Sequence, residues 1–356
     1  MNLSSLTVRN FRNLASIDFD LPSEGVVIIG DNGQGKTNFL EAVYYLVLFR
    51  SLKGAKDREL VRFGEAGFFL AGNADARVTA GFEVAGRRKK VTVDGKESKK
   101  LADAVGQITA VALSPDDRSL VDGGPAGRRR FLDVLLSLSS DGYLSKLTEL
   151  RAALRQRNAA LKSGNTNEAQ VFDQPVANAA AFVSSTRYEW AERARPRFIE
   201  LCDELGENGE PFLEYSSRHW TERGGAEGIA YALRSKVDRD VRRGMTTVGP
   251  HRDDLLLTLG GNETRRYGSA GQQRTAATAL RLLEAQALED ARGTAPIALF
   301  DDAFAELDQD RQERLLNLIG KSLPGQAIIT APRDAEVPKA LFDRPRWHMV
   351  GGQLEW

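Results

Sequence analysis

The pattern of apolar and polar positions divides the chain into stretches of two kinds. Short apolar runs typical of strands predict a mixed sheet from residues 3–8, 17–21, 26–29, 68–71 and 78–84. From residue 114 to residue 243 the sequence is charged and has helical periodicity, and a strand-like run, "DLLLTL", follows from Asp254. We therefore predict an α/β protein in which one lobe, residues 1–113 and 244–356, is split by a helical lobe, residues 114–243.

The most specific motif follows the apolar run at residues 26–29. The sequence "GDNGQGKT" matches the phosphate-loop pattern G-x-x-x-x-G-K-[ST], and a helical pattern comes after it. Glycines let backbone N–H groups converge on phosphate oxygens, Lys36 can reach the β- and γ-phosphates, and the Thr37 hydroxyl can bind Mg²⁺. The predicted ATP site contains Gly30, Asp31, Asn32, Gly33, Gln34, Gly35, Lys36, Thr37 and Asn38.

A second apolar run, residues 297–300, ends in two acids that suit the magnesium side of such a site. We expect Asp301 to hold Mg²⁺ together with Thr37, and Asp302 to polarise the attacking water, so that Lys36, Asp301 and Asp302 are the predicted catalytic residues. Paired acids after a strand can also simply cap the next helix. Because the chain also has a phosphate loop, we favour the interpretation that these acids serve a nucleotide site.

The stretch "GSAGQQRTAATALRLLEAQAL" begins a helix with a small polar loop. Ser269 is a natural N-cap, but capping does not account for Gly271 and Gln272, which leave the helix N-terminus open to an anion. The order of these elements resembles that in ATPases of the ABC class. There a signature loop and its helix are followed by the Walker B strand, here residues 297–301, and then by the D-loop, here residues 305–308. By that resemblance, Ser269, Gly271 and Gln272 serve the nucleotide of a second chain, which implies a homodimer that forms on ATP.

Several further segments resemble the RecF family, a branch related to SMC proteins. The segment "NFRN" from Asn10 resembles the whole branch, whereas three segments resemble RecF specifically: "LSPDDRSLVDGGPAGRRRFLD" from Leu113, "LRQRNAALKSG" from Leu154 and "TVGPHRDDL" from Thr247. About 230 residues without sustained heptads separate the loop lysine from the signature, which excludes a long coiled coil. The resemblance implies an ABC-type head that binds ATP and DNA and helps load RecA at single-strand gaps with RecO and RecR. It also adds Arg12 to the predicted nucleotide site.

Departures from transporter-type ABC heads point to a slow switch. The acid after Asp301 is an aspartate where those heads usually have glutamate, and Thr330-Ala331 stand where many place a histidine. No glutamine is a persuasive Q-loop candidate. We expect a slow, DNA-stimulated ATPase that acts on gapped DNA or single-strand/double-strand junctions. The alternative is a transporter- or translation-type ATPase coupled to a membrane or ribosomal partner.

Composition limits the partners and the compartment. Lys+Arg and Asp+Glu are both 49, so the chain is not a uniformly basic nucleic-acid binder, although local basic patches are possible. The single cysteine, Cys202, fits a reducing compartment. The N-terminal sequence lacks a signal-peptide pattern and the longest apolar run is too short for a bilayer, so we expect a cytoplasmic protein without a membrane partner.

Basic clusters at two places in the chain are candidates for contact with DNA. At the first place, a predicted hairpin is flanked by basic residues, whose lysines can also serve only to prevent strand aggregation: Arg87, Arg88, Lys89 and Lys90 on one side, and Lys96, Lys99 and Lys100 on the other. Arg128, Arg129 and Arg130 stand at a probable helix start, where positive charge opposes the helix dipole and therefore suggests an anionic partner. The role of His251 stays open.

Overall fold

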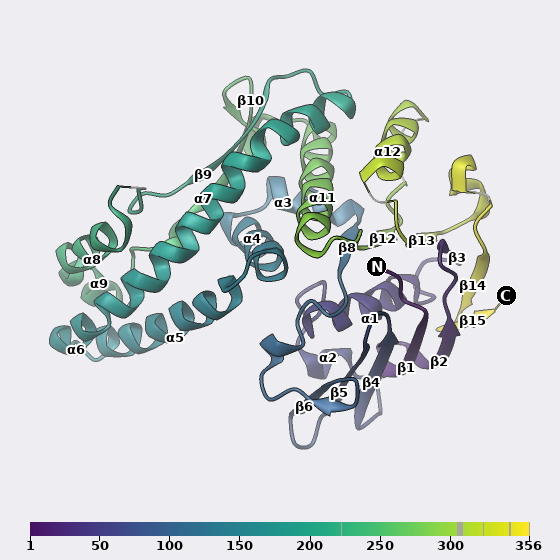
Figure 1. Cartoon of the computed structure of the whole chain (residues 1–356), viewed down its shortest axis with the longest axis horizontal. Coiled ribbons are helices and arrows are strands. Elements are labelled where there is room, and N and C mark those ends of the chain that lie inside the picture. Colours follow the sequence, from purple (N-terminus) through teal and green to yellow (C-terminus); the bar gives the residue numbers. More distant parts are fainter. Residues whose placement is uncertain (222, 305–308, 323, 342, 356) are drawn as a thin grey trace. The chain divides into compact units, whose positions relative to one another are not determined.

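The computed structural model in Figure 1 describes residues 1–221, 223–304, 309–322, 324–341 and 343–355. The chain forms two compact units, of which the first contains Met1–Asp117 and Leu280–Trp356 and the second contains Arg118–Ala279. Over the described ranges, no helix combines the length and the apolar character needed to cross a membrane.

A six-stranded sheet with the order β15-β14-β3-β13-β12-β8 carries the phosphate loop in the first unit. Its strands are β3 (Gly25–Ile29), β8 (Ala110–Leu113), β12 (Ile297–Asp301), β13 (Ala327–Ala331), β14 (Arg346–Val350) and β15 (Gln353–Glu355). All neighbours are parallel except β14 and β15. The strands β3, β8, β12 and β13 are buried at every position, as expected for parallel strands that are covered on both faces.

A second sheet of the first unit is antiparallel, with the order β2-β1-β4-β5-β6-β7. Its strands are β1 (Ser5–Phe11), β2 (Leu14–Asp20), β4 (Gly67–Asn73), β5 (Arg77–Glu83), β6 (Arg88–Val93) and β7 (Lys96–Glu97). Helix α1 (Lys36–Leu48) contacts strands of both sheets and is buried along most of its length. The short helix α2 (Asp57–Leu60) and α12 (Gln309–Ser322) complete this unit.

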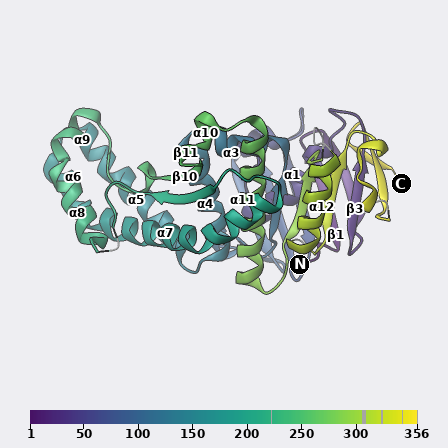
Figure 2. The ribbon, with the colours of Figure 1, turned by 90° about the horizontal axis from the view of Figure 1, so that it is seen from above.

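The second unit is mainly helical and contains the antiparallel sheet β11-β10-β9. Its strands are β9 (Pro211–Ser216), β10 (Asp254–Leu259) and β11 (Asn262–Glu263). Its helices are α3 (Ser119–Asp122), α4 (Pro125–Ser139), α5 (Tyr143–Lys162), α6 (Thr166–Val171), α7 (Asp173–Glu204), α8 (Gly225–Ser235), α9 (Val237–Arg243) and α10 (Thr264–Tyr267). Helix α5 packs along α7, as Figure 2 shows, and α11 (Ala270–Arg292) begins in this unit and continues into the first.

A buried arginine joins three helices of the second unit. Arg157 on α5 has no exposed side-chain surface, and it pairs with Asp173 on α7 at 2.9 Å and with Asp240 on α9 at 2.7 Å. It also donates to the hydroxyl of Thr246 at 2.9 Å. A buried guanidinium is stable only when its charge and its N–H groups have partners, so this cluster fixes the packing of α5, α7 and α9.

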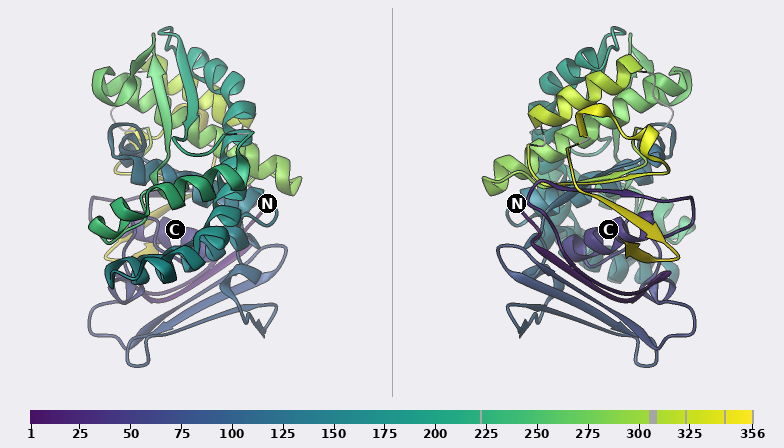
Figure 3. Two further views of the ribbon diagram at one scale, coloured as in Figure 1. Left: turned by 90° about the vertical axis from the view of Figure 1, so that its left-hand side faces the viewer. Right: turned by 90° about the vertical axis from the view of Figure 1, so that its right-hand side faces the viewer.

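The two ends of the chain meet in the first unit. Figure 3 shows the hairpin of β14 and β15 in yellow beside the purple N-terminal strands, and β15 contacts β2. The side chain of Gln326 accepts from the backbone N–H of Leu3 at 2.8 Å and donates to its carbonyl at 3.0 Å. The first unit is therefore assembled from segments that are distant in sequence.

The predicted α/β fold is confirmed, with sheets of both kinds around the phosphate-loop helix. The strand after residue 25, however, pairs with β13 and β14 and not with the other N-terminal strands, because local periodicity does not specify partners. The second unit extends to Ala279 and includes β10 and β11, which the sequence-based division grouped with the C-terminal segment. The boundaries 1–113, 114–243 and 244–356 stay a prediction.

Candidate nucleotide site

The phosphate loop connects β3 to α1 at the edge where the parallel strands end. Lys36, the first residue of α1, is only 4% exposed. Its ammonium donates to the backbone carbonyls of Gly30 at 2.6 Å and Asp31 at 3.2 Å. These bonds fix the ammonium inside the loop, so that a phosphate group that enters the loop meets a positioned positive charge.

The N-terminus of α1 carries no side-chain cap. Gly35 precedes the helix with a φ of 119°, which side chains rarely adopt, and a Cβ there would lie 2.8 Å from Oδ1 of Asn13. Asn13 is held in turn by Asn38, whose Nδ2 donates to Oδ1 of Asn13 at 2.8 Å. The first-turn N–H groups of α1 thus face the loop without a competing side-chain acceptor, which suits an anion.

The loop residues before Gly35 are more exposed than Lys36. Asp31, Asn32 and Gly33 are exposed, and Gly33 has a φ of 82° with no atom within 4 Å of the point where a Cβ would lie. Gln34 is half-buried. The structure therefore brings Lys36 and the helix N-terminus together, while these loop residues shape the backbone around them.

Thr37 and Asp301 lie together at the ends of α1 and β12. The Thr37 hydroxyl donates to Oδ1 of Asp301 at 2.8 Å. Burial raises the pKa of Asp301, the negative charge of Asp302 adds to this effect, and the hydrogen bond from Thr37 opposes it. A divalent cation would relieve the cost of the buried carboxylate, and hydroxyl and carboxylate oxygens are the ligands that Mg²⁺ prefers. These two residues therefore fit Mg²⁺.

Thr330 connects the two aspartates, although the sequence pointed to it only as the residue in place of a histidine. Its hydroxyl accepts from the backbone N–H of Asp302 at 3.0 Å and lies 3.2 Å from Oδ1 of Asp301 and 3.3 Å from Oδ1 of Asp302. Asp302 adopts a left-handed φ of 48°, which this bond supports. Register explains the contact, because β12 and β13 are parallel and Asp301 pairs with Thr330.

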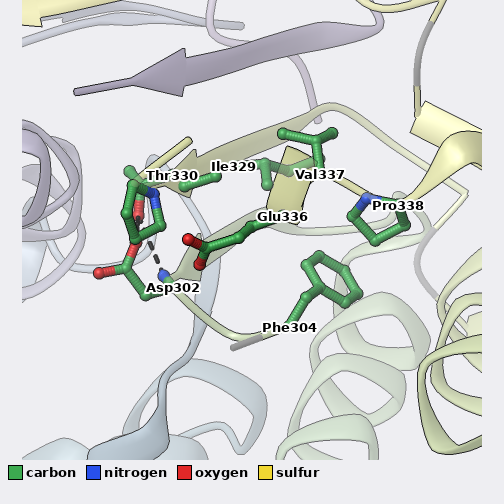
Figure 4. Close-up of a pocket in the computed structure, with 9 residues that line it drawn as sticks. Asp302, Phe304, Ile329, Thr330, Glu336, Val337 and Pro338 are labelled. Carbon is green, nitrogen blue, oxygen red and sulfur yellow. Dashed lines mark hydrogen bonds between the residues drawn. The ribbon is translucent and has the colours of Figure 1, made fainter. Parts of the chain in front are cut away.

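A small pocket opens beside the second of these aspartates, Asp302. Figure 4 shows the carboxylate of Glu336 turned toward Asp302, with Phe304, Val337 and Pro338 on the apolar side. Glu336 belongs to a short 3-10 helix, Asp334–Glu336, and nothing in the sequence pattern singled it out. The predicted D-loop, residues 305–308, follows Phe304 and lies outside the described residues.

Arg12 is held against the helix of the phosphate loop. It has a left-handed φ of 56°, its Nε donates to the buried carboxylate of Glu41 on α1 at 2.9 Å, and its Nη1 donates to the carbonyl of Glu59 at 3.2 Å. Glu41 also accepts from the hydroxyl of Ser51. Arg12 is thus placed by α1, and its contact with nucleotide stays a prediction.

The predicted signature loop lies in the second unit and is capped more fully than expected. The hydroxyl of Ser269 accepts from the N–H of Gln272 at 3.3 Å, and Oε1 of Gln272 accepts from the N–H of Ser269 at 2.9 Å. This reciprocal pair is a capping box, S-x-x-Q, and it corrects the expectation that Gln272 leaves the helix N-terminus bare. The residues between them, Ala270 and Gly271, carry the remaining N–H groups of the first turn.

The first basic cluster is only partly available to a ligand. Lys89 donates to the carbonyl of Phe49 at 2.6 Å, pairs with Asp57 at 2.8 Å and lies over the ring of Tyr45, so it is committed to the interior of the first unit. These contacts correct the prediction that Lys89 belongs to the DNA surface. Exposed side chains of the same cluster, Arg88 and Lys90, lie near Glu97 on β7, and Arg87 occupies the preceding turn.

The second basic cluster divides in the same way. Arg128 is 3% exposed and binds the carboxylate of Asp254 through Nε and Nη2, each at 2.8 Å, while Nη1 donates to carbonyls at the end of α3. The anion that the helix-start charges suggested is therefore Asp254 within the same unit, which corrects the prediction for Arg128. Arg129 is half-buried and donates to the carbonyl of Asp253 at 2.8 Å, and Arg130 is exposed.

The comparisons with known proteins match this arrangement over nearly the whole chain. A family model described as the RecF/RecN/SMC N terminal domain covers residues 2–345. The chain is 38% identical to the DNA replication and repair protein RecF of Anaeromyxobacter dehalogenans (strain 2CP-C), over 93% of this chain and 92% of that protein. The chain belongs to the RecF family. A second relative with the same name, from Myxococcus xanthus (strain DK1622), is 34% identical over 99% of this chain and 97% of its own.

Solved structures give the same result for the fold of this RecF-family protein. The structure titled "recombination mediator protein RecF-ATP in RecFOR pathway" matches with a TM-score of 0.89 and 29% identity, over 99% of this chain and 97% of that one. An SMC head bound to a winged-helix domain of ScpA matches with a TM-score of 0.54 at 15% identity, which supports the fold alone. Family membership favours the DNA-repair class over a transporter- or translation-type ATPase.

Proposed function

We propose that the protein is an ATP-dependent DNA-binding ATPase of recombinational repair and replication restart. The observation that carries the proposal is the convergence of Lys36, Thr37 and Asp301 at one sheet edge, with the Thr37 hydroxyl 2.8 Å from Asp301. The names of the relatives support the repair role, and solved relatives titled RecF-ATP and RecF-ATPrS support ATP as the nucleotide.

The geometry suggests how each residue would contribute to hydrolysis. Lys36 and the N-terminus of α1 would hold the β- and γ-phosphates, and Thr37 and Asp301 would hold Mg²⁺, which neutralises charge on the phosphates. Water attacks the γ-phosphorus, the bond to the bridging oxygen of the β-phosphate breaks, and Asp302 accepts the proton of the water. Asp302 has a shorter side chain than glutamate and is therefore expected to lie farther from the water, so we propose slow turnover. We propose separately that DNA stimulates this turnover.

The partners follow from the family resemblance. We propose binding to gapped DNA or to single-strand/double-strand junctions, and RecA loading with RecO and RecR. Of the two basic clusters, Arg87, Arg88, Lys90 and Arg130 remain the candidate DNA contacts, since they are exposed. On ATP the protein would form a homodimer in which Ser269, Gly271 and Gln272 of one chain complete the site of the other.

A mixing experiment tests this proposal. Lys36→Ala removes the positive charge that would contact the phosphates. Ser269→Arg places bulk on the signature loop, while the phosphate loop of its own chain stays able to bind ATP. Each variant alone should be nearly inactive in phosphate release with gapped DNA. In a mixture, half the dimers carry one intact site of two, so roughly a quarter of the wild-type rate should return. A mixture without activity, in a protein that stays monomeric with ATP by sedimentation, would refute the dimer.

A further inference from the structure

The hairpin of β14 and β15 touches the phosphate loop directly. Its turn consists of two residues, Gly351 and Gly352, with φ values of 55° and 81°, and Val350 pairs with Gln353 across the turn. In such a tight turn the N–H groups of the two central residues are not used within the hairpin ladder and need an acceptor elsewhere.

Both of these N–H groups donate to one residue of the phosphate loop. The N–H of Gly351 donates to the side-chain oxygen Oε1 of Gln34 at 2.6 Å, and the N–H of Gly352 donates to the backbone carbonyl of Gln34 at 2.8 Å. The same carbonyl accepts from Nδ2 of Asn13 at 3.0 Å. Gln34 immediately precedes Gly35 and Lys36, so these bonds fix the backbone that orients the helix N-terminus and the lysine.

Close backbone packing holds the hairpin in place at two more points, one on the phosphate loop and one on Asn13 in the turn between β1 and β2. A Cβ on Gly30, the first glycine of the loop motif, would lie 2.4 Å from the carbonyl oxygen of Met349 on β14. A Cβ on Gly352 would lie 2.5 Å from the carbonyl oxygen of Asn13. Two glycines are therefore required by contact with neighbouring backbone, one in the loop and one in the hairpin, and neither contact leaves room for a side chain.

We propose that the β14–β15 hairpin is a positioning element of the nucleotide site, which holds the phosphate loop in its anion-binding form through Gln34. This inference rests on the proposed ATP site and goes beyond it, because it assigns a role in nucleotide affinity to the turn at Gly351 and Gly352. It follows that nucleotide binding and hairpin docking stabilise each other, since both favour the same loop conformation.

A matched pair of glycine substitutions isolates the contact. Gly352→Ala introduces the clash with Asn13, whereas Gly95→Ala adds a Cβ at a φ of 78° in the β6–β7 turn, where no atom lies within 4 Å. The two alanines carry similar backbone strain. We expect MgATP to bind Gly352→Ala on the order of 10-fold more weakly than wild type in equilibrium dialysis, and Gly95→Ala within about 2-fold, because only the first displaces the phosphate loop.

A second variant and a second measurement protect the test against misfolding of Gly352→Ala. Gln34→Met removes the acceptor for Gly351 and leaves both glycines, and it should speed hydrogen exchange in the peptide 346–355 without nucleotide. In the wild type, MgATP should slow exchange of the same peptide. Equal ATP affinities for Gly352→Ala and Gly95→Ala, or unchanged exchange in Gln34→Met, would overturn the role of the hairpin and leave the ATP site standing. Wild-type protein that fails to bind MgATP would overturn both proposals.

Discussion

Replacement of Thr330 by valine tests how the two aspartates are organised. Valine has nearly the shape of threonine but lacks the hydroxyl, so the substitution leaves the backbone N–H of Asp302 without its acceptor. Thr330 is 1% exposed, and water cannot easily take over this bond. Leaving a buried donor unsatisfied costs about 1–3 kcal/mol, and we expect a loss of stability of that size in chemical denaturation.

The effect on turnover follows from the position of Asp302. Without the hydroxyl its left-handed backbone loses support, and the carboxylate is no longer held for the attacking water. If about 2 kcal/mol of that positioning is lost in the transition state, kcat falls roughly 30-fold. At a pH where Asp301 is ionised, binding of MgATP should change little, because the hydrogen bonds of Lys36 to the loop carbonyls and of Thr37 to Asp301 do not involve Thr330.

The pH dependence provides a readout that a general loss of packing would not move. The hydrogen bond from Thr330 lowers the pKa of Asp301 against the larger effect of burial, so its removal raises that pKa further. Asp301 must be ionised to hold Mg²⁺, and the acid limb of the pH–rate profile should therefore shift to higher pH in Thr330→Val. Thr330→Ser retains the hydroxyl and should resemble wild type in profile and rate. A serine variant as impaired as valine, or a valine variant with the wild-type profile, would refute this reasoning.

Three further predictions concern other parts of the molecule. Asp302→Asn should bind MgATP normally in dialysis but release almost no phosphate, because an amide cannot accept the proton of the water; normal turnover would exclude that role. Arg130→Ala should lower the slope of log affinity against log salt for gapped DNA by about 1. Arg128→Ala should instead destabilise the fold by about 3–5 kcal/mol, since it leaves Asp254 unpaired. Burial lowers the pKa of His251 to about 4, so the neutral ring stabilises the fold above pH 6.5 and this stability is lost as the pH falls toward 4. Denaturation at pH 7 and pH 5 should show about 2 kcal/mol of loss from this residue, and His251→Gln should lack it.

The fold class and the meeting of the phosphate-loop helix with Asp301 were predictable because their signals are local. Each signal lies within one short segment: the glycine spacing of the loop with Lys36, and the acid after an apolar strand. The order of the segments then indicates an ABC-type head. The capping box at Ser269 is equally local, since Gln272 stands three residues later, and it could have been recognised from S-x-x-Q alone. The sequence therefore contains the information that specifies this cap.

The remaining features depend on contacts between distant segments. Thr330 meets Asp301 only because β12 and β13 pair in one particular register, and Arg128 finds Asp254 across more than a hundred residues. Lys89 shares a run of basic residues with Lys90, yet strand alternation places the two side chains on opposite faces of β6. Charge along the sequence therefore did not distinguish buried pairs from exposed cations.

The pairing of β3 has a consequence for synthesis on the ribosome. This strand is made within the first thirty residues, but both of its neighbours, β13 and β14, lie after residue 326. The second unit is complete once Ala279 has been made, whereas a fully apolar strand from the first unit must wait until β13 and β14 have been made. During that interval its unpaired edges are open to wrong partners, so the nascent first unit is the part of this protein with the greatest need of chaperone protection.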